Sequence, residues 1–221
     1  MLKIMFNDAC GLTTQVIDGC KTRTARFEKM PDKYRHYLNM KEENAIPYLI
    51  NTYDDQTGEF TIKQASPFRE GMAELASFEP RYKKGDTYAV AQPYIQLPEK
   101  LQKQFNLDSD TPGWANKMFV KPAYMPWRIR IINVEIFPLY VYAGSEHLCL
   151  EEGIIKAPDV FPDNWRYSHY SGYHDAKYFD NYGDAFASLI NEVSGAGTWK
   201  NHYNDWIVSY KFEVEPNIIT L

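Results

Sequence analysis

Cationic and hydroxyl side chains follow one another in the run Lys21-Thr22-Arg23-Thr24-Ala25-Arg26. Cations gathered in this way could hold an anionic group such as a phosphate. The run begins soon after Gly19, a residue that can end a helix in the left-handed conformation, so it starts at a change of chain direction. The alternative is a solvated basic turn in which Thr22 and Thr24 only bond backbone groups.

A second pair of cations, Arg128 and Arg130, alternates with Ile129 and Ile131. Side chains alternate across a strand, so both arginines should project from one side, where each guanidinium could hold a phosphate or a carboxylate through two hydrogen bonds. The alternative is that they pair with acidic side chains nearby. The residues alone leave both interpretations open.

Aromatic side chains are concentrated between residues 165 and 182. Their rings could stack on nucleic-acid bases, with Arg166 near a phosphate, or they could pack a long loop onto the core. Packing is favoured, because Tyr and Trp are common wherever loops cover a core. His169 and His174 match no standard metal-site spacing and have no cysteine pair beside them, so the sequence predicts no metal.

Composition limits the partners that the chain can have. It carries 24 basic and 29 acidic side chains, a formal net charge of −5, so any contact with nucleic acid must be local. Aromatic residues reach 15%, which favours a lined cleft or a stacking surface. The three cysteines are far apart and indicate reduced thiols in a cytoplasmic protein. With neither a signal peptide nor a long apolar run, we expect no membrane contact, and no cofactor is indicated.

Hydrophobic periodicity and turn signals predict the elements that position these residues. A short helix is expected around Leu12 to Ile17, capped by Thr13 or Thr14, and a longer one at 184–193, ending before Gly195. One more short helix is expected at 99–105, inside a polar surface insertion. Strands are expected at 46–53 and 59–63, paired as a hairpin, at 87–91 after the turn Lys84-Gly85-Asp86, at 128–134 and at 206–214.

The strand patterns also predict which faces are buried. Residues 128–134 are substantially apolar on both faces, as in a strand of a barrel wall. Residues 206–214 alternate, so one face should belong to the core and the other to water, and residues 140–142 could extend the sheet. No repeat or break in composition marks a second domain, so residues 1–221 are expected to form one α+β domain around a small mixed barrel.

Several segments, taken in order, resemble the ASCH family as it occurs in phage and bacterial proteins. The shared order carries the resemblance, because each motif by itself is weak. The resemblance spans nearly the whole chain but is dense only in the pieces Gly19-Cys-Lys-Thr-Arg-Thr-Ala-Arg26, Tyr82-Lys-Lys-Gly-Asp-Thr-Tyr88, Met125-Pro-Trp-Arg-Ile-Arg-Ile131, Glu152-Gly-Ile154, Gly195-Ala-Gly-Thr-Trp199 and residues 206–212.

The resemblance implies a PUA-like barrel with short flanking helices, long loop insertions near residues 29–80, 95–120 and 156–180, and a cleft beside the GxKTxTxR loop at residues 19–26. Some ASCH-like proteins remove the acetyl group from N4-acetylcytidine, using a Lys and a Thr of this loop and a Glu. Other members are thought only to bind RNA. The Lys, Thr and Glu match Lys21, Thr24 and Glu152 here.

Amide hydrolysis needs a nucleophile, a base and a donor for the leaving amine, and the resemblance assigns these roles to Thr24, Lys21 and Glu152. Lys21 acts as a base only if its pKa falls well below about 10.4. In a straight strand residues 21 and 24 point to opposite faces, so their cooperation requires a bend between them. Apart from the motif, Glu152 reads as an acid in a solvated turn.

Three functions are therefore open. The first is an ASCH-type module that binds RNA or a modified nucleobase or nucleotide. The second is an amidohydrolase that deacylates nucleosides like N4-acetylcytidine. The third is a phage or mobile-element accessory protein with a vestigial cleft and insertions that bind a protein partner.

The chain also departs from phage relatives, since Val90-Ala-Gln-Pro-Tyr94 lacks a cation and a carboxylate that they usually carry. The further residues expected to bind the ligand are Thr22, Arg23, Arg26, Arg128 and Arg130.

Overall fold

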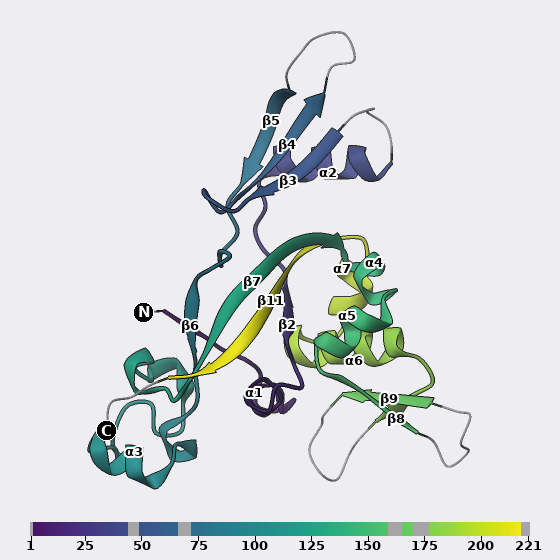
Figure 1. Ribbon diagram of the computed structural model, residues 1–221. Helices are drawn as coiled ribbons and strands as arrows, with labels where there is room; N and C mark the ends of the chain where they lie inside the picture. The colour runs from purple at the N-terminus through teal and green to yellow at the C-terminus, as the bar shows by residue number, and fades with distance from the viewer. Residues whose placement is uncertain (1, 44–48, 66–71, 159–164, 170–176, 218–221) are drawn as a thin grey trace.

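The computed structural model describes residues 2–43, 49–65, 72–158, 165–169 and 177–217. They form a mixed α+β fold with several sheets and short helices (Figure 1). Within these ranges the strands make three separate sheets, and none of the three closes into a barrel. No helix in the same ranges has the length and apolar character that crossing a membrane requires.

The largest sheet contains five strands in the order β1, β6, β7, β11, β2. β1 (Lys3–Ile4) runs parallel to β6 (Thr87–Val90), and the remaining pairs are antiparallel: β7 (Trp127–Pro138), β11 (Trp206–Pro216) and β2 (Arg23–Arg26). β7 and β11 curve together through the middle of the molecule (Figure 1). The second half of the GxKTxTxR loop, Arg23–Arg26, is therefore a strand at one edge of this sheet.

The three strands predicted for this sheet are confirmed, but their burial differs from the prediction. On β7, Ile129 is fully buried whereas its neighbour Arg130 is exposed, so the second face is not a covered wall there. On β11, the face predicted to meet water is covered over its first half, because Ser209 is 0% exposed. The cover comes from α4 (Leu139–Ala143), whose Tyr142 hydroxyl lies 3.4 Å from that of Ser209.

The existence of α4 corrects the prediction that residues 140–142 extend the sheet. Pro138 ends β7 and stands at the N-cap of the helix. Proline has no N–H to continue a ladder of hydrogen bonds, and its φ suits the start of a helix. A short apolar run such as Leu-Tyr-Val-Tyr does not distinguish a strand from a buried helix by periodicity.

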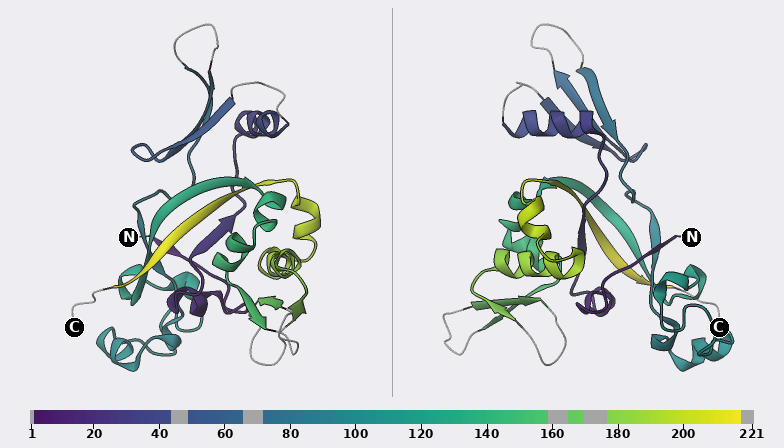
Figure 2. Two further views of the ribbon diagram at one scale, coloured as in Figure 1. Left: turned by 45° about the vertical axis from the view of Figure 1, so that its right-hand side comes forward. Right: turned by 180° about the vertical axis from the view of Figure 1, so that it is seen from behind.

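Further helices pack beside the sheet (Figure 2). α1 (Leu12–Ile17) is confirmed, but Gly11 occupies its N-cap, so the prediction that a threonine caps it was wrong. Thr13 lies inside the helix and bonds Asp8 instead. The predicted helix at 184–193 is confirmed as the longer α6 (Tyr182–Ser194). α5 (Glu146–Glu151) and α7 (Thr198–His202) were not predicted.

Residues 29–80 contain a folded lobe rather than a long loop. The predicted hairpin is confirmed as β3 (Leu49–Asp54) and β4 (Glu59–Ala65), although residues 46–48 lie outside the described ranges. The sequence did not predict β5 (Met72–Phe78) or α2 (Asp32–Glu42), which covers one face of the sheet β3-β4-β5 (Figures 1 and 2). α2 was missed because its buried face rests on few apolar residues in a mostly polar helix.

The other two insertions also hold structure. The predicted helix near 99–105 is confirmed as α3 (Glu99–Gln104). A third sheet contains β8 (Ile154–Pro158), β9 (Trp165–His169) and β10 (Tyr178–Phe179). Tyr167 and His169 of β9 are buried, which agrees with packing, whereas Tyr178 is exposed. His174 lies outside the described residues.

Candidate functional site

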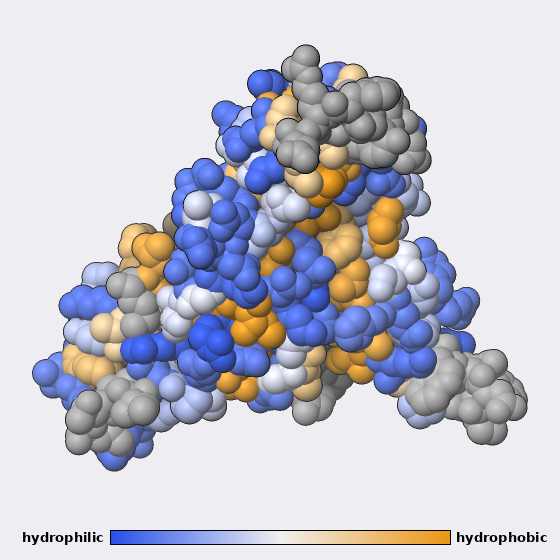
Figure 3. Space-filling model, turned by 45° about the horizontal axis from the view of Figure 1, so that its top comes forward, coloured by the Kyte–Doolittle hydropathy of each residue, from blue (hydrophilic) through white to orange (hydrophobic). Residues whose placement is uncertain are grey.

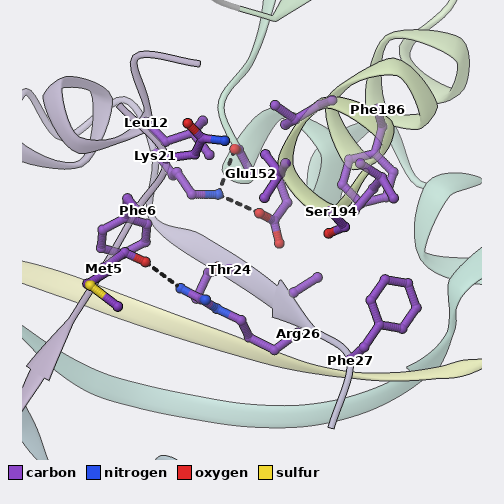
Figure 4. Close-up of a pocket in the computed structure, with 15 residues that line it drawn as sticks. Met5, Phe6, Leu12, Lys21, Thr24, Arg26, Phe27, Glu152, Phe186 and Ser194 are labelled. Atoms are coloured by element: carbon purple, nitrogen blue, oxygen red, sulfur yellow. Dashed lines mark hydrogen bonds and ion pairs between the residues drawn. The ribbon is translucent and has the colours of Figure 1, made fainter. Parts of the chain in front are cut away.

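A cavity of about 280 Å³ opens between β2, α6 and the segment that follows β1 (Figure 4). Its polar groups come mainly from the GxKTxTxR loop and from the residue after α5. Its apolar wall comes mainly from α6. The lining residues are Met5, Phe6, Asn7, Leu12, Lys21, Thr24, Ala25, Arg26, Phe27, Glu152, Phe186, Leu189, Ile190, Val193 and Ser194.

Lys21 lies on the floor of this cavity and is only 1% exposed. Its Nζ forms an ion pair with the Glu152 carboxylate and donates a hydrogen bond to the Glu152 carbonyl oxygen at 2.7 Å (Figure 4). Burial lowers the pKa of the Lys21 amine, against the opposing pull of Glu152, and the charge of Arg26 lowers this pKa further. The amine therefore releases its proton more readily than a surface lysine does.

Thr24 lies on β2 and lines the same cavity as Lys21. The two side chains share it because Lys21 precedes the strand, which begins at Arg23. The backbone N–H of Lys21 still bonds the last turn of α1, through the Gln15 carbonyl at 3.0 Å, whereas that of Thr22 bonds the Glu151 carbonyl at 2.9 Å. Lys21 is thus outside the strand's alternation, which meets the requirement that the chain bend before Thr24.

Glu152 is brought to Lys21 by the end of α5. It stands at the C-cap of that helix, and its backbone N–H bonds the Leu148 carbonyl at 3.1 Å. Gly153 follows with φ +98°, a conformation that favours glycine, and turns the chain into β8. The side chain is 6% exposed, and its Oε1 accepts a hydrogen bond from the Tyr142 hydroxyl at 2.8 Å. Glu152 is therefore a buried site residue, not an acid of a solvated turn.

Arg26 also lines the cavity. Its Nη2 donates to the Met5 carbonyl oxygen at 2.9 Å, and its guanidinium carbon lies 5.9 Å from the centre of the Phe6 ring. Among the described residues its Nε is buried without a hydrogen-bond partner. Arg26 carries no ion pair with a described carboxylate, so its positive charge is available to a ligand.

The other four residues predicted to bind the ligand do not line this cavity. Thr22 contributes backbone hydrogen bonds between α5 and β11. Arg23 is buried on the far side of β2, between Glu135 and Glu151, each at 2.7 Å. Arg130 pairs with Glu213 and, at 2.8 Å, with Glu215, which is the alternative interpretation from the sequence. Arg128 lies beside it on β7, with Nε buried and unpartnered in the described chain.

Sequence reasoning missed two parts of the site. The apolar wall on α6 was predicted only as core, and no pattern distinguishes a residue that faces a cavity from one that faces the core. Tyr142 was missed because its segment was assigned to a strand. A buried tyrosine needs a partner for its hydroxyl, but the sequence does not name that partner.

The arrangement joins a buried amine, a hydroxyl and a carboxylate at the base of a small, mostly apolar cavity. These are the groups that acyl transfer uses as base, nucleophile and acid. No cluster of three or more metal-ligating side chains occurs in the described ranges.

His169 does not line this cavity. It is fully buried, with its Nε2 3.0 Å from the Ser188 hydroxyl, and burial lowers the pKa of its imidazole.

Comparison of the chain with protein-family models, with curated proteins and with solved structures gave no match. The arrangement of the side chains is therefore the basis for a functional conclusion.

Proposed function

We propose that the cavity is a base-binding site of the ASCH type, which takes a modified nucleobase, nucleoside or nucleotide, either free or exposed in RNA. The observation that carries this proposal is that Lys21, Thr24 and Glu152 line one cavity although 128 residues separate Thr24 from Glu152. The sequence resemblance selects these same residues from the order of short motifs along the chain, without coordinates.

A PUA-like barrel is part of the proposal. The curvature of β7 and β11 supports it, because a sheet can close into a barrel only if its strands curve and tilt around a common axis. The described strands form an open sheet with β1 and β2 at its edges. α6 packs beside the β2 edge and supplies one wall of the cavity.

The shape and lining of the cavity suit a planar heterocycle. Its volume of about 280 Å³ is close to the lower end of the range for small-molecule sites. Phe6 and Phe186 offer ring surfaces, and Lys21, Thr24, Arg26 and Glu152 offer polar groups. Arg26 can donate to a carbonyl oxygen or to a phosphate of the ligand.

A second candidate function is hydrolysis of an acylated cytosine amine, and the burial of Lys21 favours it. A neutral Lys21 amine would take the proton from the Thr24 hydroxyl as Thr24 Oγ bonds to the acyl carbon. The carbon–nitrogen bond then breaks, and the leaving amine receives the proton that Lys21 took from Thr24, which makes the Lys21 amine neutral again. Water would hydrolyse the Thr24 ester and release the carboxylic acid. A lowered pKa of Lys21 increases the fraction of neutral amine near pH 7.

The experiment combines binding with turnover. Titration calorimetry with cytidine, N4-acetylcytidine and a short single-stranded RNA measures binding, and acetate release from N4-acetylcytidine measures hydrolysis. Hydrolysis through Thr24 predicts loss of turnover in Thr24→Val, which keeps the shape of the side chain, and retention of turnover in Thr24→Ser, which keeps the hydroxyl. Lys21→Ala and Glu152→Gln should also lose it.

The outcomes separate the candidates. Binding without turnover in the parent protein supports the module that only binds. Turnover that survives in Thr24→Val excludes Thr24 as the nucleophile. If neither nucleosides nor RNA bind, the proposal fails, and an accessory protein with a vestigial cleft becomes the better account.

A further inference from the structure

Tyr142 lies behind the cavity and contacts Glu152, whose carboxylate is the one carboxylate among the described residues that line it. The side chain is 0% exposed, and its ring packs between those of Phe137 and Phe186, with 5.5 Å between ring centres in each pair. The ring is thus held by packing, and the hydroxyl points at Glu152 Oε1 at 2.8 Å. Because burial raises the pKa of Tyr142 well above its ordinary value, the hydroxyl stays protonated and acts as a donor.

Both oxygens of Glu152 are therefore held by donors on different elements. Lys21, which precedes β2, binds Oε2, and Tyr142 of α4 binds Oε1. Each donor withdraws part of the charge of the carboxylate, so each weakens the hold that the carboxylate has on the other. The remaining lone pairs of Glu152 are those that a ligand can use.

Tyr142 is in turn part of a buried row of polar groups. Its hydroxyl receives a hydrogen bond from Ser209 of β11 at 3.4 Å, and Ser209 receives one from Arg23 Nη1 at 3.0 Å. Arg23 is held by Glu135 and Glu151. The row leads from the rear of β2, through β11 and α4, to the floor of the cavity.

We propose that Tyr142 is a positioning residue of this site, whose hydroxyl fixes the Glu152 carboxylate and limits how strongly that carboxylate holds the ammonium of Lys21. The role of the pair in ligand chemistry rests on the proposed function, but the coupling between the three side chains does not. Other titratable or charged groups also interact electrostatically with these side chains. Arg26 interacts with Lys21, and Cys149 interacts with Glu152. Arg23 interacts with Tyr142.

The test measures the proton affinity of Lys21 without a ligand. The protein is labelled with ¹³C at the lysine ε-carbon, the Lys21 signal is assigned by its loss in Lys21→Met, and its shift is followed against pH by NMR. Removal of the Tyr142 hydroxyl leaves more charge on Glu152, so Tyr142→Phe should raise the titration midpoint of Lys21, by about half a pH unit or more. Ser209→Ala should move it in the same direction by less.

Tyr140→Phe is the matched control. Tyr140 lies on the same helix, and its hydroxyl also donates to a carboxylate, that of Glu42 at 2.8 Å, but outside the cavity. Its loss should leave the Lys21 midpoint unchanged. A midpoint that does not move in Tyr142→Phe, or that moves equally in Tyr140→Phe, overturns the inference. Ser209→Ala gives the same reading if Tyr142→Phe does not fold.

The consequence for function is measured separately. If the parent protein hydrolyses N4-acetylcytidine, Tyr142→Phe should lower kcat about tenfold to a hundredfold and leave KM nearly unchanged, because a misplaced carboxylate affects the reaction more than ligand binding. A parent protein that binds no nucleoside overturns the proposed function while the Lys21 titration stands. A fixed midpoint in a protein that does bind nucleosides overturns only the role of Tyr142.

Discussion

At the floor of the cavity, Lys21 and Glu152 form an ion pair whose side chains are 1% and 6% exposed. Water cannot stabilise either charge, so each depends on the other and on its hydrogen bonds. Glu152 retains Tyr142 as a second partner, whereas the partners of the Lys21 amine among the described residues are the carboxylate and the carbonyl of Glu152. A pair held in this way is coupled, and its two members should not act independently on stability.

We therefore predict that Lys21→Met and Glu152→Gln each lower the free energy of unfolding by about 3–5 kcal/mol, because each leaves one charge buried without its partner. The double variant Lys21→Met/Glu152→Gln should cost clearly less than the sum of the two, since no isolated charge remains. Urea unfolding of the four proteins measures these free energies.

Lys103→Met is the control for this cycle. Its ion pair with Glu99 is exposed at both ends, so its loss should hardly change stability. Additive effects of Lys21→Met and Glu152→Gln would show that the two buried charges are not coupled.

At the scale of elements, the turn between α5 and β8 decides where Glu152 points. Gly153 has φ +98°, and a Cβ added there would meet the Gln15 amide oxygen of α1. Gln15 is only 7% exposed, so its side-chain amide has little room to move away from an added Cβ. The position of the carboxylate thus depends on a close approach between two helix ends.

We predict that Gly153→Ala destabilises the protein and also disturbs the site. The left-handed backbone alone should cost about 1–3 kcal/mol, and the contact with Gln15 should shift Glu152 away from Lys21. Urea unfolding measures the first effect, and the NMR shift of the Lys21 ε-carbon measures the second.

Gly85→Ala is the matched variant, because Gly85 has φ +88° but open space around an added Cβ. It should show the cost of the backbone strain while the Lys21 signal remains in place. Equal disturbance of Lys21 in both variants would mean that the contact with Gln15 does not position Glu152.

At the scale of the molecule, the lobe of α2 and β3–β5 shares one hydrophobic core cluster with the body. Tyr82, just after the lobe, packs on Tyr88 and on Tyr210, with ring centres 4.8 Å and 5.1 Å apart. Two hydrogen bonds, Trp206 to Asn39 at 2.7 Å and Tyr140 to Glu42 at 2.8 Å, also join the body to α2. Apolar side chains are visible at the base of the lobe (Figure 3).

We predict that lobe and body unfold in one transition. All five tryptophans lie outside residues 29–80, but Trp206 bonds Asn39 of the lobe, so the measurement uses a Trp206→Phe background, in which the fluorescence of the other four reports on the body. Ile62→Ala removes a fully buried side chain of the lobe and should lower the free energy of unfolding measured by this fluorescence by about 2–5 kcal/mol.

Met72→Ala provides the comparison, since Met72 lies in the same lobe but is exposed, and should have little effect. If the fluorescence transition is unchanged in Ile62→Ala while circular dichroism shows an earlier phase, the lobe folds on its own.

Elements with strong local patterns could be predicted from the sequence. Helix α6 and strands β6 and β11 follow from side chains that repeat at the period of their own element. The hairpin β3–β4 follows from its turn signal, and β7 from a run that is apolar on both faces. Neighbours in the chain decide all of these properties. The run at residues 21–26 stands out by its charges, but it and Glu152 were assigned to one site only through the resemblance to the ASCH family, which stays a prediction. Without the resemblance, the run would be interpreted as a solvated basic turn and Glu152 as an acid in a surface turn.

Which of these side chains lie in the same cavity depends on the tertiary fold and could not be predicted from local patterns. Thr22 to Arg26 are adjacent in sequence, yet Thr24 and Arg26 line the cavity whereas Arg23 lies behind the strand with Glu135 and Glu151. Tyr142 joins the site because a helix replaces the expected strand after Pro138. The physical reason is that burial and pairing depend on groups more than a hundred residues apart, and no local pattern records which of them will share a cavity.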